Sequence, residues 1–166
     1  VTGQRLFVSQ NGNNRVTAYD VSTIVNGENA TNVLGQFTFT ATTASSTASG
    51  MNAPRGVAYD PAGNRLFVAS NGNNRVTVFD VAAITNGEPA TNIIGQASFA
   101  GTTAATTQAG LNSPTGIAFD EVNNRLFVAN LVAHRITVYD VATVTNGENA
   151  THGFGQPDFT TAKLSN

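Results

Sequence analysis

Short apolar runs separated by polar turns recur along the chain. In residues 65–80, RLFVAS and RVTVFD are rich in β-branched and aromatic residues, and the NGNN between them tolerates positive φ. This pattern predicts two antiparallel strands joined by a tight turn. Apolar runs at 55–60 and 92–99 flank the hairpin. Together the four segments predict a small sheet of four strands.

The same unit is repeated at a spacing of 60 residues, as the positions of Arg5, Arg65 and Arg125 show. A fixed period of this kind means that one structural unit is used several times.

Both faces of each predicted sheet are apolar. Leu66 and Val68 point to one side of their strand, whereas Phe67 and Ala69 point to the other, because side chains alternate along a strand. Each sheet must therefore be covered on both faces. Four-stranded sheets that cover one another radially are the blades of a β-propeller. We predict an all-β propeller with about 2.75 blades per chain.

The repeat also sets the expected blade boundaries within a single propeller fragment, 1–166. Blade 1 is expected at 1–39 without its innermost strand, blade 2 at 54–99, blade 3 at 114–159, and inter-blade loops at 40–53 and 100–113. These loops are expected on the same rim as the NGNN turns. On the opposite rim, DVAAITNGE at 80–88 predicts one helical turn that begins at Asp80 and ends at Gly87.

Three segments resemble NHL repeats: SPTGIAFDEVNNRLFVAN at 113–130, NGNNRVTVFD at 71–80 and AHRITVYD at 133–140. NGENATNVLGQ at 26–36 and FGQPDFT at 154–160 are similar to the long-blade bacterial members. The resemblance implies a propeller fold, which in this family is used by binding modules, scaffolds and lyases.

The composition of the chain limits the classes of partner that we expect. Only 11% of residues are charged, the net charge is -2, and Lys163 is the sole lysine, so nucleic acid and membrane surfaces are not expected partners. No apolar run is long enough to span a bilayer. The chain has no Cys, so redox chemistry does not define its compartment, and we favour a secreted or periplasmic location.

Ring closure is the main open question for the predicted propeller. Propellers close with roughly 4 to 8 blades, so one chain would leave two apolar blade faces in water. Two copies supply six blades, whereas three copies supply nine. We therefore expect a homodimer that completes a six-bladed ring, with a longer native chain as the alternative.

Most charged residues repeat with the blades, which favours structural Arg–carboxylate pairs over catalysis. The repeated sets are Arg5, Arg65, Arg125, Arg15, Arg75, Arg135, Asp20, Asp80, Asp140, Glu28, Glu88, Glu148, Asp60 and Asp120. His134 and His152 stand where the other blades have Asn, without a partner at metal-ligand spacing. We predict no catalytic, cofactor-binding or metal-binding residues, and no cofactor.

Where the family pattern often ends its second strand with Asp, this chain has Gln10, Ser70 and Asn130. The metal-binding carboxylates that the resemblance implies for a lactonase or lyase are therefore missing here. We expect a non-enzymatic binding or scaffold module. The alternative is part of a metal-dependent propeller lyase or lactonase with its catalytic residues in blades absent here.

Two groups of residues are candidates for binding. The rim residues Asn71, Asn73, Asn112, Arg55 and Thr115 offer hydrogen bonds to a peptide or glycan ligand, although Asn in such turns also has a purely conformational role. The third hairpin reads LVAH instead of NGNN and exposes Leu131 and Val132, which we consider a candidate interface.

Overall fold

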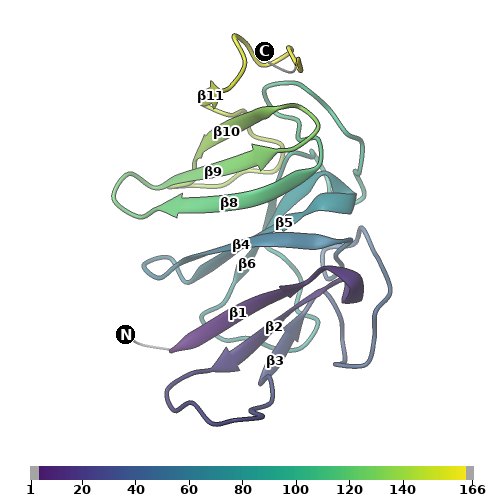
Figure 1. Ribbon diagram of the computed structural model, residues 1–166, viewed down its shortest axis with the longest axis vertical. Coiled ribbons are helices and arrows are strands. Elements are labelled where there is room, and N and C mark those ends of the chain that lie inside the picture. Colours follow the sequence, from purple (N-terminus) through teal and green to yellow (C-terminus); the bar gives the residue numbers. More distant parts are fainter. Residues whose placement is uncertain (1–3, 164–166) are drawn as a thin grey trace.

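A computed structural model describes residues 4–163, which form three antiparallel sheets stacked face to face along the long axis of the molecule (Figure 1). We call these sheets blades 1, 2 and 3. Blade 1 contains β1 (Arg5–Gln10), β2 (Arg15–Asp20) and β3 (Asn32–Leu34). Blade 2 contains β4 (Pro54–Asp60), β5 (Arg65–Ser70), β6 (Arg75–Asp80) and β7 (Asn92–Ile94). Blade 3 contains β8 (Pro114–Asp120), β9 (Arg125–Asn130), β10 (Arg135–Asp140) and β11 (His152–Phe154).

The central hairpin of each blade has the predicted pattern. In blade 2, β5 and β6 pair from Arg65 opposite Asp80 to Ser70 opposite Arg75. A short 3-10 turn, η2 (Asn71–Asn73), joins them and ends at Asn74, whose φ of 49° lies in the left-handed region. Asn adopts this region more readily than most residues, so the sequence of the turn and its backbone agree. A matching turn, η1 (Asn11–Asn13), joins β1 and β2.

Two apolar cores lie between the blades. Leu66 and Val68 belong to the core between blades 1 and 2, whereas Phe67 belongs to the core between blades 2 and 3. All three side chains are completely buried. The prediction that blade 2 is apolar on both faces is confirmed, and it is the stacking of these faces that holds the blades together.

A buried arginine anchors each loop that leads into the next blade. Arg75 has no exposed surface, and its guanidinium donates to the carbonyls of Ser46, Thr47 and Gly50 at 2.8, 2.9 and 3.2 Å. It also donates to the carbonyl of Phe99. Burial lowers the pKa of Arg75 to about 10. The loop residues thus provide the acceptors that a buried cation requires.

The structure corrects three predictions. No helical turn forms at Asp80 within the described chain: its carboxylate accepts from the backbone N–H of Ala82 at 2.9 Å, which is an Asx turn. The outermost strand β7 ends at Ile94 and not at residue 99, because Gly95 has a φ of +95°. The second set of arginines binds carbonyls and not carboxylates; its members are Arg15, Arg75 and Arg135.

The described part of blade 1 has three strands, and residues 1–3 of its expected range lie outside the described residues. Arg–carboxylate pairing is present at Arg65 and Asp60, with a 2.6 Å contact. No helix within residues 4–163 has the length and apolar character needed to cross a bilayer.

Candidate functional site

The innermost strands bring part of the predicted rim together. Arg55 on β4 is exposed, and its carbonyl accepts a hydrogen bond from the Ser9 hydroxyl of β1. Thr115 lies on β8 and is half-buried. Its backbone passes close to β4, as the space at Gly56 shows: a Cβ added there would stand 2.4 Å from the Thr115 carbonyl oxygen. The amide of Asn71 donates to the Pro114 carbonyl at 3.1 Å. Arg55, Thr115 and Asn71 are therefore held near one another across blades 2 and 3.

The other two rim residues have less freedom to bind a ligand. Asn73 is buried and donates to the Ser45 carbonyl at 2.9 Å, which ties the hairpin turn to the loop before it. Asn112 is half-buried, and its backbone N–H donates to the Asn130 side chain at 3.2 Å. Of the five candidates, Arg55 is the most exposed, and Asn73 has a structural hydrogen bond in place of a free amide.

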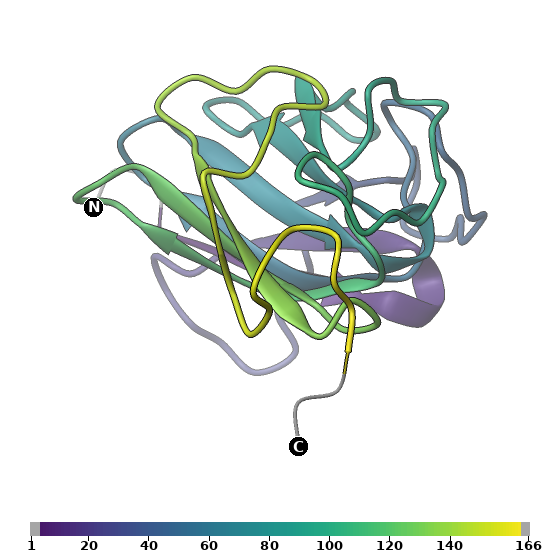
Figure 2. The same cartoon turned by 90° about the horizontal axis from the view of Figure 1, so that it is seen from above.

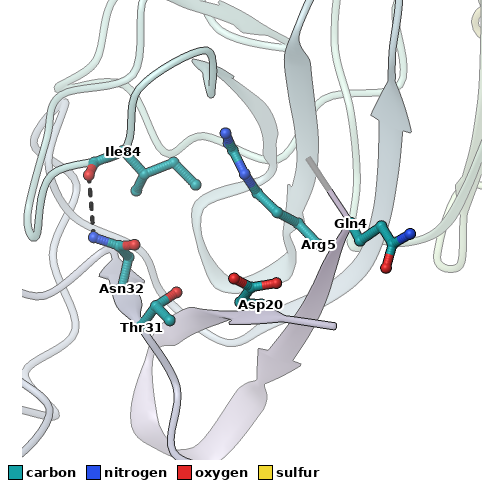
Figure 3. A pocket seen from close by; sticks show the side chains of 6 residues that line it. All are labelled: Gln4, Arg5, Asp20, Thr31, Asn32 and Ile84. Carbon is teal, nitrogen blue, oxygen red and sulfur yellow. Dashed lines mark hydrogen bonds between the residues drawn. The ribbon is translucent and has the colours of Figure 1, made fainter. Parts of the chain in front are cut away.

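A cavity of about 370 Å³ lies on the opposite rim, between blades 1 and 2 (Figure 3). It is lined by Gln4, Arg5, Asp20, Thr31, Asn32 and Ile84. All except Ile84 come from blade 1. The Asn32 amide donates to the Ile84 carbonyl at 3.0 Å and closes one side of the cavity.

The charges in this cavity are used within the protein. Arg5 donates to the carbonyl of Val81 and, at 3.3 Å, to that of Ala82. The backbone N–H of Ser22 lowers the pKa of the Asp20 carboxyl by stabilising its charged form. The cavity therefore holds a cation and an anion that serve inter-blade contacts and turn geometry, and its described lining residues include no nucleophile paired with a base.

Blade 3 has a related cavity of about 190 Å³, lined by Asn123, Arg125, Asp140, Thr151 and His152. Here no further blade is present within residues 4–163. Arg125 is exposed, and its contact with Asp120 is long, at 3.9 Å. The carbonyl acceptor that Arg5 finds in the next blade has no equivalent for Arg125 in the described chain.

An apolar groove lies on the outer face of blade 3. It has a volume of about 280 Å³ and is lined by Gly116, Ile117, Ala118, Phe127, Ala129 and Ile136. Leu131 and Val132, the candidate interface residues, are 57% and 50% exposed. They occupy the hairpin tip next to the Ala129–Ile136 pair, so the structure places them beside the groove.

The two histidines do not form a metal site with other described residues. His134 is exposed, with a φ of 50°, and occupies the left-handed position that Asn14 and Asn74 hold in the other hairpins. His152 is also exposed, and its Nδ1 lies 3.1 Å from the Thr151 hydroxyl. Within residues 4–163 no group of three or more His, Cys, Asp or Glu side chains is arranged to hold a metal ion.

Neither the rim cavity nor the apolar groove is predicted by the sequence pattern. The cavity has a signal, namely the 60-residue spacing of Arg5, Arg65 and Arg125, but this spacing favours ion pairs when residue types alone are considered. The groove has a weaker signal in the sequence: Phe127 stands 60 residues after the buried Phe67, but it belongs to blade 3, the last of the three blades. Its exposure depends on whether another blade covers blade 3 in space, which periodicity alone does not specify.

Comparison with known proteins agrees with the propeller architecture. A family model described as NHL repeat matches residues 51–79, which run from the end of the first inter-blade loop through most of β6. No curated protein matches the chain.

Similar solved structures cover most of the chain. Kuenenia stuttgartiensis hydrazine synthase matches with a TM-score of 0.58 at 16% identity, covering 95% of this chain and 34% of that one. A functionally unknown protein from Desulfotomaculum acetoxidans matches with a TM-score of 0.56 at 15% identity, covering 93% and 39%. A nidogen/laminin complex matches with a TM-score of 0.50 at 18% identity, covering 82% and 40%.

At these identities the likeness concerns the fold alone, and the chain spans only 34% to 40% of the lengths of those three chains. The repeated blades and the NHL match lead to one conclusion: the chain consists of β-propeller blades and contains an NHL repeat at residues 51–79.

Proposed function

We propose that the chain is a non-enzymatic binding or scaffold module that completes its propeller by pairing with a second copy of itself. Its two end blades would then be covered as blade 2 is covered now. The proposed assembly is a homodimer with six blades around one channel.

The observation that supports this proposal is the contrast between equivalent positions. Leu66 and Val68 are completely buried between blades 1 and 2, whereas Leu6 and Val8 are 51% and 36% exposed on the outer face of blade 1. At the other end of the stack, Phe154 is 55% exposed. Burial of apolar surface of this extent is favourable, at about 25 cal/mol per Å², and clustered exposed apolar side chains commonly mark interaction sites.

The rim of the innermost strands is the proposed ligand surface. Arg55 contributes an exposed cation. The Thr115 hydroxyl and the Asn71 amide lie nearby and already donate to the carbonyls of Ala129 and Pro114, so their oxygens remain to accept from a ligand. Neutral hydrogen-bonding groups of this kind suit a peptide or glycan, and the channel of a closed ring would bring two such surfaces face to face across its axis.

Sedimentation of the whole chain over a range of micromolar concentrations tests the assembly. We expect a species of twice the 17.2 kDa chain mass. A compact, folded species of 17.2 kDa at every concentration would contradict the proposed pairing. Higher polymers would mean that copies join without closing a ring.

A further inference from the structure

We propose that the turn at residues 21–28 of blade 1 is a preformed docking hook for the open edge of β11 in a second copy of this chain. This inference rests on the proposed self-association and specifies its contacts. It predicts a head-to-tail interface between blade 3 of one copy and blade 1 of the other.

The contact between blades 1 and 2 provides the template. The equivalent turn of blade 2 covers the outer edge of β3: the Val33 N–H donates to the Asn86 side-chain oxygen at 3.0 Å, and the Gly87 N–H donates to the Val33 carbonyl at 3.1 Å. Asn86 and Gly87 thus satisfy both backbone groups that Val33 directs away from β2. An edge strand is protected from other pairing in this way.

The contact between blades 2 and 3 repeats this arrangement. The Ile93 N–H donates to the Asn146 side chain at 2.9 Å, and the Gly147 N–H donates to the Ile93 carbonyl at 3.4 Å. In both contacts a side-chain amide from the outer strand, Asn32 or Asn92, donates at 3.0 Å to a carbonyl of the same turn. The hook is therefore a recurrent inter-blade device and not a feature of one loop.

Blade 1 carries the same hook with nothing bound to it in residues 4–163. Gly27 has a φ of +77°, close to the +71° of Gly87 and the +72° of Gly147. Asp20 forms the same Asx turn to Ser22 that Asp80 forms to Ala82. The Asx turn and the left-handed Gly27 are therefore formed before any partner binds, which lowers the entropic cost of docking. The hydrogen bonds between Thr85 and Glu88 that close the turn of blade 2 have no counterpart between the described residues Val25 and Glu28, so this part of the hook would be completed on docking.

Blade 3 carries a similar edge, in which His152 replaces Asn32 and Asn92, so the backbone bonds of the template can be repeated there but the bond from the side-chain amide cannot. β11 is exposed throughout, and Gly153 occupies the position of Val33 and Ile93. Within the described chain, no hydrogen bond reaches the outward N–H and carbonyl of Gly153. Arg125 likewise lacks the carbonyl of a next blade to which Arg5 and Arg65 donate. A second copy would supply this acceptor as the Val21 carbonyl.

Apolar seating accompanies these hydrogen bonds. Ile84 and Val144 of the inner hooks pack against the two cores. Their counterpart Ile24 is 82% exposed, and its neighbour Val25 is 62% exposed. Val25 replaces Thr85 and Thr145 of the inner hooks, so the free hook is more apolar than the bound ones. This difference favours a hook that is covered by protein.

The two surfaces lie at opposite ends of the stack of blades, with blade 1 at the bottom of Figure 1 and β11 at its top. Figure 2 shows β11 and the C-terminal segment in front of the other blades when the stack is viewed from above. One chain therefore cannot join its own ends. A head-to-tail contact between different surfaces closes a ring only if the rotation between copies permits it, and six blades lie inside the range in which propellers close.

Variants at the two surfaces test the hook in the whole chain. Asn26→Ala combined with Ile24→Asp removes the acceptor and the apolar seat, and we expect at least a tenfold weaker association. Asn29→Ala, just after the hook, is the control and should leave association unchanged. Gly153→Pro removes the edge N–H that points away from β10, so it should weaken association similarly. The variant should still fold, because Pro is tolerated at such edge positions. Gly153→Ala keeps that N–H and is its control.

Mixing the hook variant with the Gly153→Pro variant distinguishes the head-to-tail arrangement from others. Each variant alone has both ring contacts damaged, whereas the mixed pair retains one intact contact. We therefore expect association to recover on mixing, measured by sedimentation with circular dichroism as the check on folding. Failure to recover, or full association of either variant alone, would overturn the hook. A wild-type chain that remains monomeric would instead refute the self-association on which the hook rests.

Discussion

Phe67 and Phe127 occupy the same position in successive blades but have different surroundings, and alanine substitution of each tests the stacking of the blades. Phe67 is completely buried, with its ring 5.7 Å from that of Phe119 and the Arg65 guanidinium 5.5 Å from its centre. Deleting a buried aromatic ring leaves a cavity between two blades. Phe67→Ala should therefore lower the free energy of unfolding by about 3 to 5 kcal/mol.

Phe127 is only half-buried, at the apolar groove of blade 3. The sequence pattern predicts burial of both faces of its strand, but within the described residues its outer face has no neighbouring blade. In a single chain Phe127→Ala should therefore cost roughly 1 to 2 kcal/mol, about half the value for full burial. If a second copy covers the groove, the same substitution should also weaken association.

Urea denaturation at two protein concentrations, one below and one above the dissociation constant of the homodimer, separates the effect on the stability of one chain from the effect on association. The loss for Phe67→Ala should be the same at both concentrations, whereas the loss for Phe127→Ala should grow at the higher one. A loss below about 1 kcal/mol for Phe67→Ala would refute the stacked-blade core. An equal, concentration-independent loss at both sites would refute an exposed outer face on blade 3.

Three further predictions concern polar groups. Arg75→Met should destabilise the fold by about 3 kcal/mol or more, because it leaves buried carbonyls without a donor. Arg15→Met, at a half-buried position, should cost less. Equal losses of unfolding free energy for the two variants in urea denaturation would contradict this reasoning. His134→Asn should change stability by less than about 0.5 kcal/mol, since Asn suits its φ of 50°; a large drop in the melting temperature, or loss of a bound metal in elemental analysis, would show that the ring has another role. Backbone N–H groups of Thr160 and Thr161 lower the pKa of Asp158 to about 2, so the turn that they form should be complete above pH 3.8 and should loosen as the pH falls through about 2. An NMR titration that gives an ordinary carboxyl pKa for Asp158 would exclude these hydrogen bonds. Asp158→Asn, which removes the titrating group, is the control.

The blades were predictable because their information is local and periodic. The NGNN turns require positive φ, and Asn74 adopts it. Alternation along RLFVAS assigned Leu66 and Phe67 to opposite faces, and the two cores confirm that assignment. The 60-residue period then required that similar faces meet, since a sheet that is apolar on both sides is stable only when both are covered.

The destinations of the charged side chains were not predictable in the same way. Arg65 does pair with Asp60, five residues away in sequence. Arg75 instead reaches carbonyls 24 to 29 residues away, on the loops at Ser46 and Phe99. Every residue has a backbone carbonyl, so residue type does not reveal which carbonyls will surround a buried guanidinium.

The sequence by itself thus determined the strands of the central hairpins and their turns, the repeat and the need for blade stacking, but not where the outermost strand β7 ends. Only the tertiary structure decided that Asp80 forms an Asx turn without a helix, and that Asn86 and Gly87 close the edge of β3. The physical reason is that strand formation depends on neighbouring residues, whereas edge protection depends on where a turn 53 residues further along the chain is placed in space.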